Sequence, residues 1–376
     1  MKDLLKDIGK KKLIIIAGAI VGFIFLLIIA LLIFHAVNNR KTGYKDIENK
    51  LLSAAKDYYS ENENLLPQSE SEQITIDDVS LTAAGYLKSM SELTSDMEGV
   101  SCSATVVVSY GNGNYRYTPL LDCGDSYKSI TLSSYISDTN KVERQIDGSK
   151  ESGLYDLNGE LVYRGENPNN YVEFSGRMYR IVKVTADERV VLILDEKNES
   201  SVWDDRFNDE RSYNDGINDY QVSRLKEVLD ELYNDTWLVK DSDKGLLSAH
   251  RVYTGKRHES DNDNSGSIET SSYIDNQYVS VLPLYDYLNA SVDENCESAE
   301  TDSCMNYNYL NQYDYNWWTS TADAETTFRV YRAASGGSVD KITASSNGHV
   351  RPVIYLVSDA LYVDGDGTKD NPFTIK

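Results

Sequence analysis

The stretch DNDNSGSIE, residues 261–269, has the residue types and the spacing of a calcium-binding loop. Side-chain oxygens recur on alternate residues, and Gly266 stands where such a loop bends sharply. The candidate calcium ligands are Asp261, Asp263, Ser265, Ser267 and Glu269. An EF-hand loop carries a bidentate glutamate at its twelfth position, which here is Ser272, so we predict weak calcium binding. The alternative is a flexible acidic loop that holds no metal.

Two adjacent tryptophans, Trp317 and Trp318, are the second candidate for ligand contact. Neighbouring residues of a strand face opposite sides of a sheet, so one indole could lie in the core while the other is exposed. An exposed indole would stack on a sugar ring or on a proline-rich peptide. The alternative is that both indoles pack in the core or under a loop.

Motifs for catalysis are missing from the sequence. There is no GxSxG nucleophile motif, and the histidines form neither an HExxH motif nor a zinc-binding pattern. Acidic residues are plentiful, but one sequence does not pair two of them across a cleft. We therefore predict a protein that is not an enzyme, with an enzyme of unknown chemistry as the alternative.

The four cysteines are spaced as two disulfides. Cys102 and Cys123 flank two β-rich runs that are separated by GNGN, and folding this hairpin would bring its ends within disulfide reach. Closing that loop contributes about 3 kcal/mol to stability. Cys296 and Cys304 bracket a short polar loop and form the second predicted pair. Zinc is the alternative, but neither pair has CxxC spacing or a nearby histidine.

An apolar run near the start of the chain predicts a membrane anchor. No residue from Leu13 to Phe34 is charged, and about 20 such residues span a bilayer core. The run is too long for a cleaved signal, so we predict a transmembrane signal anchor over 13–37. Residues 1–12 hold five lysines and form the predicted basic, cytoplasmic leader. The remaining domains of this single-pass cell-membrane protein would then be extracellular, where thiols oxidise.

The net charge of −23 restricts the partners. So acidic a chain repels nucleic acid, and we predict no binding to DNA or RNA. The charge suits calcium, basic partners or a crowded cell wall. The alternative is that it serves solubility alone.

Residues 44–135 are predicted to form one small module. An amphipathic helix begins at GYKDIENKLL, a short strand and a helix follow in ITIDDVSLTAAGYLK, and the disulfide-closed hairpin comes last. Together with the apolar run, this order resembles a type IV pilin or pseudopilin. AAKDYYSEN, AAGYLK and YRYTPLLDCG are similar to pilin-like modules of Firmicutes and Mollicutes surface proteins. No glutamate lies inside the apolar run, as it does in prepilins, so we predict a pilin-like stalk.

A polar stretch, 136–150, is the predicted linker to a second module over 151–376. NNYVEFSGRMYRIVKVTADERVVLILDE predicts three consecutive strands, and NDYQVSRLKEVLDELYND predicts a helix. ENPNNYVEFSGRMYRIVKV, YLNQYDYNWWTSTA, RAASGGSVDK and GHVRPVIYL resemble C-type-lectin-like folds related to formylglycine-generating enzymes. Those enzymes need a reactive cysteine pair near the end of the fold, and this chain has no cysteine after Cys304.

The predicted class is therefore α+β, with an N-terminal transmembrane helix, a small pilin-like module and a mixed C-type-lectin-like domain. We predict a membrane-anchored binding or adhesion protein, with an extracellular glycan or protein as its ligand. The alternative is a structural subunit of a type IV-like pilus or secretion machine, with pilus-like subunits as partners. Calcium is the only cofactor that the sequence suggests.

Overall fold

The computed structural model describes residues 43–69, 72–111, 113–138, 152–296, 298–299, 301–311 and 313–376. The predicted leader, 1–12, and the predicted transmembrane segment, 13–37, lie outside these residues. So does the predicted linker from residue 139 onward. A search of the described helices finds none that is both long enough and apolar enough to cross a membrane.

The described residues form mainly β-sheets, which corrects the predicted α+β class with its transmembrane helix. Among the described helices, only the one at 43–61 and α6 (Arg224–Asn234) exceed six residues. The reason lies in the second half of the chain. Its apolar segments are short, rich in Val, Ile and Tyr, and bounded by Gly, Asn and Asp, and this pattern favours strands and tight turns.

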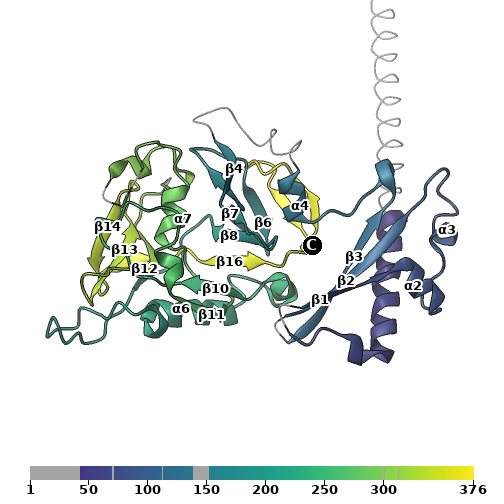
Figure 1. The fold of residues 1–376 in the computed structure, drawn as a ribbon, viewed down its shortest axis with the longest axis horizontal. Coiled ribbons are helices and arrows are strands. Elements are labelled where there is room, and N and C mark those ends of the chain that lie inside the picture. Colours follow the sequence, from purple (N-terminus) through teal and green to yellow (C-terminus); the bar gives the residue numbers. More distant parts are fainter. Residues whose placement is uncertain are drawn as a thin grey trace, which may run out of the picture. The chain divides into compact units, whose positions relative to one another are not determined.

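The described chain divides into two compact units (Figure 1). The first unit contains residues 43–65, 75–106 and 119–128, and the second contains 66–74, 107–118 and 129–376. Helix α4 (Leu132–Ser137) thus belongs to the second unit, ahead of the predicted start of that module at residue 151. Its Leu132 and Ile136 are fully buried, and Tyr135 stacks on Tyr362 at a centroid distance of 3.8 Å.

The helix at 43–61 supplies the core of the first unit. Helical spacing predicts an apolar face on this helix. Its residues Tyr44, Ile47, Leu51, Ala55 and Tyr59 are buried, whereas Tyr58 is only half-buried. Two short helices follow, α2 (Asp78–Ala83) and α3 (Met90–Leu93). The sequence offers Asp77 or Asp78 as the cap of α2, and the structure has Asp77, which accepts a hydrogen bond from the Ser80 amide.

A three-stranded sheet has the order β1-β2-β3. Its strands are β1 (Gln73–Asp77), β2 (Ser103–Gly111) and β3 (Asn114–Asp122). The predicted hairpin is therefore present. Gly113 in its turn has φ +74°, a left-handed conformation that glycine adopts without strain.

The larger sheet of the second unit has eight strands, with the path β16-β8-β7-β6-β18-β17 and the hairpin β4–β5 joined to β7. Its strands are β4 (Gly153–Leu157), β5 (Glu160–Arg164), β6 (Tyr171–Phe174), β7 (Arg177–Val184), β8 (Val190–Leu194), β16 (Val353–Leu356), β17 (Tyr362–Asp364) and β18 (Phe373–Ile375). The three consecutive strands that the sequence predicts are β6, β7 and β8. Ser175 and Gly176, both at positive φ, make the first turn.

A five-stranded sheet, in the order β14-β13-β12-β15-β9, and a two-stranded ribbon, β10–β11, complete the second unit. Their strands are β9 (Ser200–Val202), β10 (His250–Tyr253), β11 (Tyr273–Gln277), β12 (Trp317–Ala322), β13 (Arg329–Ala333), β14 (Val339–Thr343) and β15 (Asn347–His349). Helices α6 and α7 (Leu284–Asn289) contribute to the same core. The helical spacing of NDYQVSRLKEVLDELYND predicts Val222 on the apolar face of this helix. Val222 is instead 47% exposed, because α6 begins only after the capping residue Ser223.

Candidate functional site

Both predicted disulfides are confirmed. Cys102 is bonded to Cys123 across the ends of the β2–β3 hairpin, and Cys296 is bonded to Cys304. The chain has four cysteines, and none of them is free. Two disulfides mark an extracellular or secreted protein, because cytosolic reductants keep thiols reduced.

Neither tryptophan offers an exposed face, so the predicted stacking platform is wrong. Trp317 is 1% exposed and Trp318 is fully buried. The Trp318 indole donates a hydrogen bond to the Ser201 carbonyl at 2.9 Å, and a Cβ at Gly348 would lie only 2.7 Å from its ring. Strand β12 is an inner strand of its sheet, and all six of its residues are buried. The two indoles face opposite sides of the sheet, and both sides of this strand are buried in the core.

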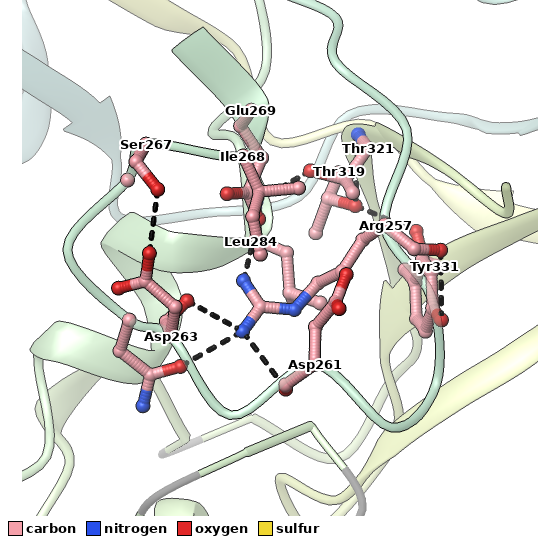
Figure 2. Close-up of polar contacts among 12 residues, drawn as sticks. Arg257, Asp261, Asp263, Ser267, Ile268, Glu269, Leu284, Thr319, Thr321 and Tyr331 are labelled. Carbon is pink, nitrogen blue, oxygen red and sulfur yellow. Dashed lines mark hydrogen bonds and ion pairs between the residues drawn. The ribbon is translucent and has the colours of Figure 1, made fainter. Parts of the chain in front are cut away.

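The predicted calcium loop is built around an arginine. Figure 2 shows the fully buried side chain of Arg257 reaching into the loop 261–269. Its Nη1 donates to a carboxylate oxygen of Glu269 at 3.0 Å, and its Nη2 donates to the Asp263 carbonyl at 2.8 Å. Nη2 also lies 3.0 Å from the Asn264 side-chain oxygen and 3.3 Å from the Asp261 carbonyl. The guanidinium thus takes the oxygen contacts that a cation would need.

The acidic side chains of this loop serve turns instead of a metal. Asp261 accepts from the His258 amide at 2.8 Å, and Asp263 accepts from the Ser265 amide at 2.8 Å. Hydrogen bonds from Ser265 and Ser267 lower the pKa of Asp263 to about 2. Within the described ranges, no three His, Cys, Asp or Glu residues are grouped as metal ligands. The calcium site predicted from the spacing is therefore corrected to an internal ion pair, because a buried guanidinium repels a second cation.

A serine and a histidine lie in the geometry of a nucleophile and its base. Nε2 of His250 is 2.8 Å from Oγ of Ser280, and each residue is 3% exposed. The Ser280 backbone forms a β-bridge with Val353, and the imidazole stacks on Tyr355 at 4.0 Å. Burial lowers the pKa of His250 to about 3. Because both side chains are buried and packed against β-structure and Tyr355, we assign the His250–Ser280 pair a structural role.

A buried ion pair joins α7 to the large sheet. The Lys183 ammonium of β7 lies 3.1 Å from the Asp286 carboxylate and 2.9 Å from the Glu160 carboxylate. It also donates to the Tyr285 hydroxyl at 3.1 Å. Burial raises the pKa of Asp286 to about 6. Every hydrogen of this ammonium has an acceptor, as a buried lysine requires. We therefore assign the cluster a structural role, in which it holds α7 against the large sheet.

The surface feature that best fits ligand contact is the segment 204–217, which we call the aromatic loop. Phe207 is 55% exposed and Tyr213 is 68% exposed, the largest values for aromatic residues in the described chain. Aromatic side chains dominate the binding energy of protein interfaces when they are presented to a partner. How much Phe207 and Tyr213 can contribute to binding depends on whether the loop holds the two rings in fixed positions.

The backbone of the aromatic loop is fixed from inside by Asn208. Its backbone amide donates to the Tyr213 carbonyl at 2.8 Å, which closes the loop between the two exposed rings. Its side-chain amide donates to the Gly216 carbonyl at 2.8 Å and to the Thr327 carbonyl at 3.2 Å. The side chain is 2% exposed, so water competes little for these bonds.

The base of the loop is held by Asp204, which is fully buried. Its carboxylate accepts from the Ile217 amide at 2.7 Å and from Nε of Arg206 at 2.8 Å. Gly216, with φ +84°, passes so close that a Cβ would lie 2.3 Å from the Asp204 carbonyl oxygen. Only glycine fits this position, both in conformation and in space.

The tip of the loop is tied to the segment before β13. The Glu210 carboxylate accepts from the Thr327 amide at 3.2 Å and from its hydroxyl at 2.6 Å. Arg211 bonds Asp215 at 2.9 Å, and its guanidinium lies 4.7 Å from the Phe328 ring. With base, middle and tip bonded, the exposure of the two rings belongs to an ordered loop.

Sequence reasoning missed the aromatic loop. The segment DDRFNDERSYNDG has no apolar periodicity and is typical of a solvated turn region. The available signal was two aromatic residues placed six apart among charged ones, with Asn, Asp and Gly at positions that fix turns.

Comparison with known proteins gives no relatives: no family model, no curated protein and no solved structure matches this chain.

Proposed function

We propose that this chain is an extracellular binding protein, and that the aromatic loop is where the second unit contacts its ligand. The observation that carries the proposal is the exposure of Phe207 and Tyr213 on a loop fixed by hydrogen bonds at its base, middle and tip. A fixed loop loses little conformational entropy on binding. The two disulfides support a working place outside the cytosol.

The proposal also assigns both parts of the chain to module families, because their sequence motifs resemble those families. The amphipathic helix, the three-stranded sheet and the Cys102–Cys123 disulfide support a pilin-like module in the first part of the chain. In the second unit, the buried tryptophans of β12 and the tight packing at Gly348 support a C-type-lectin-like domain. A binding or adhesion role fits that pairing, whereas fold alone assigns no ligand.

The test is a glycan and peptide array probed with the full chain and with a Phe207→Ala/Tyr213→Ala variant. We expect wild type to bind a subset of probes and the double variant to lose at least tenfold in affinity for the same subset, because exposed aromatic anchors carry interface energy. Tyr273→Ala is the matched control, since Tyr273 is also an exposed ring, at 47%, on strand β11. Equal binding by all three proteins would reject the aromatic loop as the site.

A second candidate is a structural subunit of a pilus-like assembly, favoured by the presence of a helix, a small sheet and a disulfide in the first part of the chain. This candidate predicts ordered self-association of the purified full chain, with no need of a ligand. Analytical ultracentrifugation over a concentration series measures it, and a monomer at all concentrations would argue against it.

A further inference from the structure

We propose that the aromatic loop binds a lysine- or arginine-rich segment of a partner protein, whose cationic groups lie over the rings of Phe207 and Tyr213. This inference rests on the proposed binding function and names the chemistry of its ligand. Three properties of the loop carry it: the sign of its charge, the exposed acid that lies between the two rings in the sequence, and the order of the loop.

The aromatic loop and the two residues after it are strongly acidic. Residues 204–219 contain six acidic side chains and two arginines. Both arginines are already bonded inside the loop, Arg206 to Asp204 at 2.8 Å and Arg211 to Asp215 at 2.9 Å. Neither charge is left over to attract an anion. The rings therefore stand in a negative field on a chain whose net charge is −23.

One acid of the aromatic loop has no bonding partner within the described part of the fold. Asp209 lies between Phe207 and Tyr213 in the loop and is exposed. Its side chain forms no hydrogen bond and no ion pair with any described residue, whereas Asp205 pairs with Arg224 at 3.0 Å and Asp219 caps the Gln221 amide at 3.1 Å. A carboxylate that the fold does not use, on the same loop as two exposed rings, suits a partner that carries cationic side chains.

Cation recognition explains the aromatic and acidic groups together. Lysine and arginine groups bind aromatic faces by cation–π attraction and bind carboxylates by charge-assisted hydrogen bonds. A neutral sugar would use the rings but gain nothing from the negative field, and an anion would be repelled by it. A basic peptide segment is also long enough to reach both rings, and the fixed loop spares it an ordering cost.

The test measures binding of the full chain to a lysine-rich decapeptide by isothermal titration or fluorescence anisotropy. Three forms of the peptide are compared: unmodified, Nε-trimethylated, which keeps the charge but cannot donate, and Nε-acetylated, which has no charge. We expect the unmodified and trimethylated peptides to bind and the acetylated peptide not to bind. Phe207→Ala/Tyr213→Ala should weaken binding about tenfold, the effect of two exposed cation–π contacts.

Two controls separate this site from the general attraction of an acidic protein for a basic peptide. Tyr273→Ala leaves the charge unchanged and removes a ring elsewhere, so binding should stay at the wild-type level. Asp209→Asn removes the free acid and should weaken binding about threefold, with a smaller effect at high salt. Circular dichroism checks that each variant is folded, which is expected because both rings and Asp209 are exposed.

The outcomes distinguish this inference from the proposed function. Equal affinity of wild type and the double variant for the unmodified peptide would overturn the inference. So would binding of the acetylated peptide at the wild-type level. If a neutral glycan binds the loop, and the double variant loses that glycan but not the peptide, the binding function stands and the basic partner is refuted. Loss of neither ligand in the double variant refutes both.

Discussion

His250 should make the second unit lose stability as the pH falls. Its imidazole is 3% exposed, stacks on Tyr355 and shares one hydrogen bond with Ser280. The charged form would be buried with no carboxylate among these contacts, and burial lowers the pKa from its ordinary 6.5 to about 3. Nearby Arg189 also disfavours a second positive charge.

The sign and size of the effect follow from proton linkage. Between pH 6.5 and pH 3 the unfolded chain binds a proton at His250 that the folded chain does not, so falling pH favours unfolding. From pH 7 to pH 4 this difference lowers the free energy of unfolding by about 3 kcal/mol, at about 1.4 kcal/mol per pKa unit. Asp286, whose pKa is raised to about 6, acts in the opposite direction between pH 3.8 and pH 6, because the folded chain then holds the extra proton.

A His250→Phe variant isolates the histidine. Phenylalanine keeps a ring for Tyr355 and costs about 1 kcal/mol at every pH through the lost bond to Ser280. The contribution of Asp286 is common to both proteins and cancels in the comparison. Urea unfolding is followed by tryptophan fluorescence, which reports the second unit alone because that unit holds every tryptophan of the chain: Trp203, Trp237, Trp317 and Trp318.

Wild type should therefore lose about 3 kcal/mol more than His250→Phe when the pH is lowered from 7 to 4. Parallel losses in the two proteins would mean that the imidazole is protonated in the folded state, and the reasoning from burial would be refuted. A larger loss in the variant would refute it as well.

Three further predictions concern the arginine-centred loop and α4. Arg257→Met should destabilise the second unit by about 3–5 kcal/mol in urea unfolding, because Glu269 is left as a buried, unpaired carboxylate. Millimolar calcium should leave the wild-type Tm unchanged; a rise that Asp263→Ala removes would contradict the loop geometry. A fragment that begins at residue 151 should unfold at lower urea than one that begins at 129, since α4 buries Leu132 and Ile136, worth about 3–6 kcal/mol. Equal midpoints for the two fragments would contradict the assignment of α4 to that core.

Local patterns predicted the local structure well. The helix at 43–61 buries most of the face that its spacing indicates, and α6 forms within the segment NDYQVSRLKEVLDELYND that predicts a helix. The turn at Ser175-Gly176 separates β6 from β7 where the sequence places it. Each of these features depends on residues within a few positions of one another, so that periodicity and turn chemistry determine them.

Features that depend on distant parts of the chain were not predictable. Arg257 precedes the acidic loop, and nothing in the spacing of the loop shows that a side chain from outside fills its centre. Alternation along β12 holds for Trp317 and Trp318, but burial also depends on β13 and β15, which flank the strand. The packing of Tyr135 on Tyr362 joins residues more than two hundred positions apart. The aromatic loop likewise owes its order to Thr327.

The arginine at the centre of the loop 261–269 has a consequence for life outside the cell. A domain whose loop is held by a bound divalent ion changes conformation when a chelator or a dilute medium removes that ion. This chain supplies the positive charge from the side chain of Arg257 and therefore keeps the loop in the same form whether the surrounding water is rich or poor in divalent ions. The loop therefore cannot respond to changes in the concentration of divalent ions, because the guanidinium is covalently attached and cannot dissociate.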